Sequence, residues 1–196
     1  YTNSYNSSGV LLSQSGIYDN GALAGDTYTY TYNADGTVAT YSVSGNAGNN
    51  TLSGGTTNAV LSGNGGYDTY QFGRGSGQDR IVNGAGDGAS AQGELDIGAG
   101  VSDNQIWLLR SGNDLIVDIM GTHDQINIAN WFGGSPDAQL AHIVTSDGSR
   151  LDVQVNQLVQ AMATYSSNNS GFDPTVVAQA PSDAALQSTI AAAWHH

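Results

Sequence analysis

The stretch GNAGNNTLS-GGTTNAVLS-GNGGYDTYQ, residues 45–71, consists of three consecutive blocks of nine residues. Each block begins with glycine and carries a large apolar residue at its eighth position, namely Leu52, Leu61 and Tyr70. A fourth block, RGSGQDRIV at 74–82, follows after two residues and places Ile81 at the same position. A fixed short period of this kind predicts a repeat architecture in which each block supplies one turn and one short strand.

The composition of each block indicates what its turn does. The glycines allow backbone conformations that turn several carbonyl oxygens toward one point, and Asp68 adds a carboxylate at the sixth position of its block. Two blocks make one coil, so alternate turns stack on the same edge. A hard cation that prefers six to eight oxygen ligands fits between such turns, and its binding energy becomes folding energy. The simpler alternative is that these glycines only form tight turns in an ordinary solenoid.

The blocks resemble the RTX (haemolysin-type) calcium-binding repeats, whose fold is a parallel β-roll. This resemblance implies a Ca²⁺ ion held by turn carbonyls and by the side chain at position six of two stacked turns. The ligands it implies in this sequence are Asn46, Gly48, Asn50, Gly63, Gly65 and Asp68, with a further site around Gly66, Asp68 and Asp87.

Two departures from the repeat pattern weaken the expected sites. Asn50 stands where the pattern has an aspartate. On the second edge Ala59 occupies that position, so Asp79 of the fourth block lacks a carboxylate partner, and the neighbouring Asn58 is a weak candidate to compensate. The number of bound ions therefore stays open, and the array is expected to be the terminal portion of a longer one.

Residues 92–153 contain short alternating runs at 95–97, 105–110, 115–120, 125–129 and 151–153, which predict an antiparallel sheet or sandwich. Apolar residues at helical spacing predict an amphipathic helix over 154–164. After a linker at 165–181, Ser182-Asp183 is typical of a helix start, with Leu186, Ile190 and Trp194 on one face. The segments LRSGNDL (109–115) and DQINI (124–128) resemble the haemolysin-type calcium-binding related domain, which implies a secreted protein exported by a type I system.

Residues 1–44 are rich in tyrosine and turn residues. The strand pair 27–32 and 37–43 around the turn at 33–36 predicts a β-hairpin with Tyr28, Tyr30 and Tyr32 on one face. The chain is thus expected to be mainly β and to contain four segments. They are a hairpin region (1–44), a calcium β-roll (45–91), a β-rich capping domain ending in a helix (92–165), and a linker with a C-terminal helix (166–196), which is a candidate secretion signal. The closing His195-His196 is a candidate remnant of a purification tag, so these two residues are left out of the functional argument.

Composition excludes several classes of partner. Four arginines and no lysine face 17 acidic residues, for a formal net charge of -13, so nucleic acid and anionic membranes would be repelled. The chain has no cysteine, and no apolar run is long enough to span a membrane. An acidic surface is also typical of plain solubility, so charge alone does not identify a ligand.

The sequence favours a non-enzymatic protein. It contains no GxSxG, HExxH or Walker motif, and the glycine-rich run 73–77 lacks the lysine and helix of a phosphate loop. The predicted function is that of a calcium-binding folding cap of a type I secreted bacterial exoprotein. Such a cap would fold on export into calcium-rich medium and would be extracellular, either free or associated with the cell surface. The alternative is an adhesin segment that binds a glycan or a protein partner through exposed tyrosines.

Overall fold

The computed structural model describes residues 1–18, 25–84, 90 and 92–195. Its strands form two sheets. The long sheet has nine strands in the order β1-β2-β3-β4-β6-β8-β12-β11-β10, and the short sheet has five in the order β14-β13-β9-β7-β5. The strands are β1 Thr2–Tyr5, β2 Leu11–Ile17, β3 Thr27–Tyr32, β4 Val38–Ser44, β5 Thr51–Ser53, β6 Ala59–Ser62, β7 Thr69–Phe72, β8 Gln78–Val82, β9 Glu94–Ile97, β10 Ile106–Ser111, β11 Asp114–Ile119, β12 Gln125–Ile128, β13 His142–Val144 and β14 Arg150–Leu151. The helices are α1 Val155–Asn168 and α2 Ala184–Ala193, so the prediction of a mainly β chain with C-terminal helices is confirmed.

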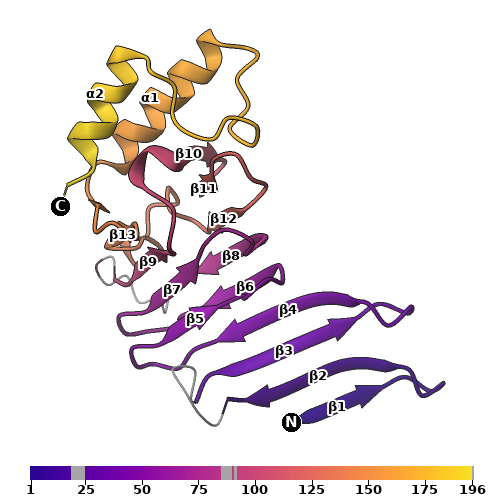
Figure 1. Ribbon diagram of the computed structural model, residues 1–196. Coiled ribbons are helices and arrows are strands. Elements are labelled where there is room, and N and C mark those ends of the chain that lie inside the picture. The colour runs from indigo at the N-terminus through magenta and orange to yellow at the C-terminus, as the bar shows by residue number, and fades with distance from the viewer. Residues whose placement is uncertain (19–24, 85–89, 91, 196) are drawn as a thin grey trace.

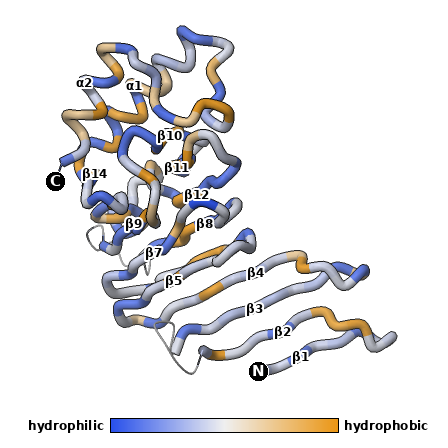
Figure 2. Tube along the Cα trace, viewed as in Figure 1, coloured by the Kyte–Doolittle hydropathy of each residue, from blue (hydrophilic) through white to orange (hydrophobic). Residues whose placement is uncertain are grey.

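Strands β1, β2 and β3 form an antiparallel meander that projects from the body of the molecule, here called the arm (Figure 1). The predicted hairpin is present, because β3 pairs antiparallel with β4 and places Tyr30 opposite Tyr41. Asp35 closes its turn by accepting the Thr37 backbone N–H at 2.9 Å. Strand β3 is close to neutral in hydropathy because threonine and tyrosine alternate along it, whereas the start of β2 is hydrophobic (Figure 2).

Strands β4 to β9, here called the coil, alternate between the two sheets. Within each sheet they pair in parallel, and Thr51 of β5 pairs with Thr69 of β7, one pair of nonapeptide blocks later. The four apolar residues at position eight are fully buried between the sheets, at 0% exposure. They are Leu52, Leu61, Tyr70 and Ile81. The period of nine in the sequence therefore corresponds to one turn and one inward-facing strand per block.

The downstream strands extend the two sheets. β10, β11 and β12 are antiparallel to one another, as expected, but β12 pairs in parallel with β8, and β13 pairs in parallel with β9. The expectation of a separate antiparallel sheet or sandwich thus differs from the arrangement found. The physical reason is that β8 and β9 leave open edges, and pairing with them satisfies backbone N–H and C=O groups that would otherwise be exposed.

The two helices lie side by side at the end of the molecule opposite the arm, where α1 packs on β10 and α2 packs on α1 (Figure 1). Met162 of α1 accepts the backbone N–H of Leu108 in β10 at a donor-to-sulfur distance of 3.0 Å. The segment between the helices is packed on the core, since Phe172 lies 4.5 Å from the Trp107 ring, centroid to centroid. Among the described residues, no helix has both the length and the hydropathy needed to cross a bilayer.

Candidate metal centre

The turns at 45–50 and 63–68 lie on one edge of the coil and stack directly on each other. Gly66 has a left-handed φ of +91°, and a Cβ there would lie 2.6 Å from the carbonyl carbon of Gly48. The Asn49 side chain accepts the Tyr67 backbone N–H at 2.8 Å, and the Asp68 carboxylate accepts the Asn50 backbone N–H at 2.9 Å. Each turn therefore donates to a side chain of the other, an arrangement here called a reciprocal clamp.

The opposite edge of the coil carries a second reciprocal clamp. Asn58 accepts the Gln78 backbone N–H at 2.9 Å, and Asp79 accepts the Ala59 backbone N–H at 2.8 Å. Ala59 lacks the side-chain oxygen that the repeat pattern requires, but its N–H serves the clamp equally well. Asn58, considered from the sequence as a weak candidate to replace the missing carboxylate, uses its side-chain oxygen to accept the Gln78 N–H.

Asp26, which the sequence reasoning missed, completes a column on the first edge. It is buried at 1% exposure, and its Oδ1 accepts the Asn50 side-chain N–H at 2.9 Å, while its Oδ2 has no hydrogen-bond partner. Asp26, Asn50 and Asp68 therefore follow one another along this edge. Asp26 lies immediately before β3, outside the nonapeptide frame, so the repeat pattern gave no signal for it.

Asp124, also missed, closes the last turn on the second edge. Its two carboxylate oxygens accept the backbone N–H groups of Gly75 and Gly77, both at 2.9 Å. Successive N–H groups that converge in this way form a nest for an anion. Because Asp124 lies between β11 and β12, a downstream turn supplies the carboxylate that the next repeat would otherwise provide.

Three of these aspartates are held in environments that disfavour their charge. Burial raises the pKa of Asp26. Burial also raises the pKa of Asp79 to about 6. The hydrogen bond from the Ala59 N–H lowers the pKa of Asp79, and the nearby Asp124 charge raises it. For Asp68, burial and then the nearby Asp26 charge raise the pKa, while the Asn50 N–H opposes them. Asp79 Oδ2 has no hydrogen-bond partner. A bound cation would relieve this unfavourable concentration of negative charge.

The other predicted ligands take the following positions. The Asn46 side chain accepts the Gly48 N–H at 2.7 Å within its own turn, and the Asn46 N–H donates to Asn50 Oδ1 at 2.9 Å. Gly63 and Gly65 belong to the stacked turn between β6 and β7, where the Gly63 N–H donates to the Val82 carbonyl at 3.3 Å. Asp87 lies outside the described residues.

The donor atoms on the first edge suit a hard cation in their chemistry. They are carboxylate, amide and carbonyl oxygens. One of them, Asp26 Oδ2, is buried and has no hydrogen-bond partner. Within the described part of the chain, however, no group of three or more His, Cys, Asp or Glu side chains converges. Carbonyl oxygens and the Asn50 amide would therefore have to complete the coordination of an ion held by Asp26 or Asp68.

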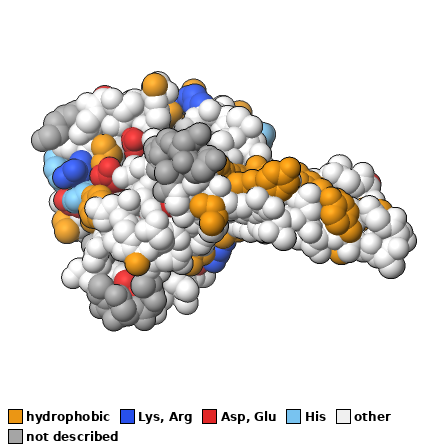
Figure 3. Space-filling view, turned by 90° about the horizontal axis from the view of Figure 1, so that it is seen from below, with side chains coloured by type: hydrophobic (Ala, Val, Ile, Leu, Met, Phe, Trp, Pro, Cys, Tyr) orange, Lys and Arg blue, Asp and Glu red, His pale blue; other side chains and the backbone are white. Residues whose placement is uncertain are grey.

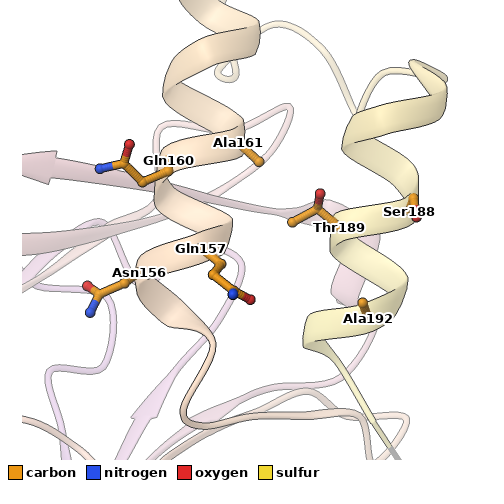
Figure 4. Close-up of a pocket in the computed structure, with 7 residues that line it drawn as sticks. All are labelled: Asn156, Gln157, Gln160, Ala161, Ser188, Thr189 and Ala192. Atoms are coloured by element: carbon orange, nitrogen blue, oxygen red, sulfur yellow. The ribbon is translucent and has the colours of Figure 1, made fainter.

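A groove between α1 and α2 offers no competing chemistry. It encloses about 580 Å³ and is lined by small and amide side chains such as Gln157, Gln160, Thr189 and Ala192 (Figure 4). None of its described lining residues is titratable, so this groove contains no acid, base or nucleophile pair.

Residues 114–154 match the family model of the haemolysin-type calcium binding protein related domain. The match begins at β11, ends after β14, and includes Asp124. This supports part of the resemblance seen in the sequence and indicates a calcium-binding type of module. It does not include the nonapeptide blocks, which lie upstream of it.

Proposed function

We propose that this chain is a calcium-dependent folding cap: its coil is an RTX-type β-roll that binds Ca²⁺ between stacked turns, and its downstream strands and helices close one end. The observation that carries the proposal is the column of Asp26, Asn50 and Asp68 beneath stacked glycine turns. With a formal charge of -13, self-repulsion opposes compaction until cations bind.

The ligands we propose on the first edge are Asp68, Asn50 and the carbonyl oxygens of Asn46, Gly48, Gly63 and Gly65, with Asp26 added from the structure. Asp79 is the proposed acid on the second edge. Gly66 and Asp87 keep the role expected from the sequence, as part of a further site. We expect the affinity of an extracellular module, with Kd of about 10⁻⁴–10⁻³ M.

We further propose that the protein is exported by a type I system and folds outside the cell, where calcium is abundant. The segments 1–44, 45–91, 92–165 and 166–196 are the proposed organisation, with the last helix as a candidate signal. In this proposal the module is structural and has no catalytic role. The raised pKa values of the buried aspartates support it, because a chain that lacks calcium would hold uncompensated charge.

A calcium titration of the intact chain tests the proposal. Circular dichroism and the melting midpoint are measured in chelator and in rising calcium. At about one hundred times Kd the ion adds about 2.7 kcal/mol, which raises the midpoint by about 5–10 °C for a chain of this size. Magnesium is the control cation, since it demands a tighter octahedral site.

Two variants locate the effect. Asp68→Asn should abolish most of the calcium response, while Asp35→Asn should keep it, because Asp35 is an exposed hairpin residue and asparagine preserves its turn. An unchanged midpoint on adding calcium, or an equal response in both variants, would contradict the proposal.

A further inference from the structure

The arm leaves one face of the long sheet without a covering layer. The short sheet ends at β5, which lies against β4, whereas the long sheet continues with β3, β2 and β1. Tyr41 and Val43 of β4 are buried beneath the short sheet. Their partners across the ladder, Tyr30 and Tyr28, share the same face but are only half-buried.

The tyrosines on this face form a preassembled aromatic row. The Tyr30 ring stacks on Tyr41 with centroids 4.4 Å apart and planes at 13°, and it lies 6.4 Å from Tyr32 at 25°. Tyr28 packs over the backbone of Gly16, where an added Cβ would lie 2.6 Å from its hydroxyl. Rings held by one another and by the sheet lose little freedom on binding a ligand.

Polar groups border these rings. A hollow of about 500 Å³ is lined by Gln14, Tyr18, Tyr28 and Tyr30 among others, and the Tyr18 and Tyr41 hydroxyls lie 2.8 Å apart. Figure 3 shows hydrophobic side chains gathered along the projecting arm. Tyrosine combines a flat apolar ring with a hydroxyl, so this surface offers stacking and hydrogen bonding together. We call it the tyrosine face, defined by Gln14, Tyr18, Tyr28, Tyr30 and Tyr32.

The tyrosine face is also uncharged. Among the described residues of the first 44, Asp26 and Asp35 are the charged side chains; one is buried under the coil edge and the other lies at the hairpin tip. No described side chain of the tyrosine face offers a charge to a ligand, and an anionic ligand would be repelled by the chain as a whole. The complementary ligand is neutral, with apolar faces and hydroxyl edges.

We propose that the tyrosine face binds an uncharged polysaccharide. A pyranose ring would lie against the face of Tyr30 that Tyr41 does not cover, with the Tyr28 ring beside it at 66° and the sugar hydroxyl groups bonding to Gln14 and the phenol oxygens. A pyranose ring presents C–H groups on its face and hydroxyls at its rim, which matches the two kinds of surface here. This site adjoins the first edge of the coil, because the Tyr18 N–H donates to the Asp26 carbonyl oxygen at 2.9 Å. The side chains proposed to contact the sugar are not among the proposed calcium ligands, so the two proposals can be tested separately.

Affinity electrophoresis of the intact chain in calcium tests the binding. Native gels contain one of four neutral polymers (dextran, mannan, soluble starch or a mixed-linkage β-glucan), or anionic alginate as the contrast. We expect at least one neutral polymer to retard the chain and alginate to leave it unaffected. Tyr30→Leu should weaken that retardation about tenfold, the equivalent of about 1.4 kcal/mol.

The matched control is Thr29→Val. Thr29 neighbours Tyr30 on β3 but lies on the opposite face of the strand. This variant should change the affinity less than twofold, because Thr29 would not contact the ligand. If Tyr30→Leu lowers the melting midpoint, Gln14→Ala replaces it, because Gln14 lies on the hollow without filling the aromatic stack. Light scattering records the oligomeric state of each variant.

Three results would overturn the proposal. The first is that no neutral polymer retards the chain. The second is that Tyr30→Leu, Gln14→Ala and Thr29→Val are all retarded equally. The third is that the wild type is a dimer and Tyr30→Leu converts it to a monomer. The last would show that the tyrosine face joins two copies of the chain.

Discussion

Replacing Asp79 with asparagine should stabilise the calcium-free chain at neutral pH. The Asp79 carboxylate is 3% exposed, its Oδ2 has no hydrogen-bond partner, and burial raises its pKa to about 6. An acid whose pKa is raised on folding destabilises the folded state above that pKa. The penalty disappears as the pH falls through about 6 toward the ordinary value of 3.8.

The structure sets the size of this effect. A rise from 3.8 to about 6 corresponds to roughly 3 kcal/mol at about 1.36 kcal/mol per pKa unit. Solvent screening near a turn lowers that figure, so we expect about 1–2 kcal/mol. For a chain of this length that is a rise of about 3–6 °C in the melting midpoint. Asparagine keeps the acceptor for the Ala59 N–H, so the reciprocal clamp survives.

Differential scanning calorimetry in chelator, from pH 4.5 to 7.5, measures the effect on wild type and Asp79→Asn. The two midpoints should differ most above pH 6 and draw closer as the pH falls to 4.5, where about a third of the difference remains because the unfolded carboxyl titrates at 3.8. Wild-type stability alone is a weaker test, because hydrogen bonds from Thr37 and Thr175 lower the pKa of Asp35 and Asp173, which act in the opposite direction. In calcium the order should reverse if Asp79 is a ligand.

A lower midpoint for Asp79→Asn than for wild type in chelator at pH 7.5 would refute the reasoning. It would mean that the carboxylate is stabilised by contacts that outweigh the cost of burying its charge. A pH-independent difference would also refute it, since only titration of Asp79 makes the two curves converge.

Other substitutions test the clamps, the core and the last helix. Asn49→Ala and Asn58→Ala should each lower the free energy of unfolding by about 1 kcal/mol, measured in urea, because each leaves a turn N–H without its acceptor. Leu61→Ala should lower it by about 2–5 kcal/mol in the same assay, since Leu61 is fully buried between the sheets. Asp183→Ala should cost about 1 kcal/mol by calorimetry, because Asp183 accepts the Leu186 N–H at the start of α2.

The inward-facing strand of each nonapeptide block could be predicted from the sequence, because the apolar periodicity reflects burial. A large apolar residue at the eighth position of each nine-residue block has to face a core, and Leu52, Leu61, Tyr70 and Ile81 all do. The two helices were also predictable, since α1 buries Leu158 and Met162 at helical spacing. Local patterns of this kind depend on neighbours in the chain, so one sequence is enough to read them.

The site residues that could not be predicted from the sequence are those that lie far from the nonapeptide blocks along the chain. Asp26 and Asp124 reach the coil edges through hydrogen bonds to Asn50 and to Gly75 and Gly77, which lie 24 to 49 positions away along the chain. No local pattern links such residues. The parallel pairing of β12 with β8 was missed for the same reason, and β13 was missed because three residues give too short an alternation to recognise.

The two ends of the described structure differ in how far their strand edges are occupied. At the end nearer the helices, Met162 accepts one backbone N–H of β10, that of Leu108, and β14 pairs with His195 through Arg150. At the other end of the described chain, β1 and β5 each leave a row of backbone groups unpaired. In the folding-cap proposal, an added strand would find unpaired backbone groups at β1 or β5, whereas the opposite end is partly occupied by α1 and His195.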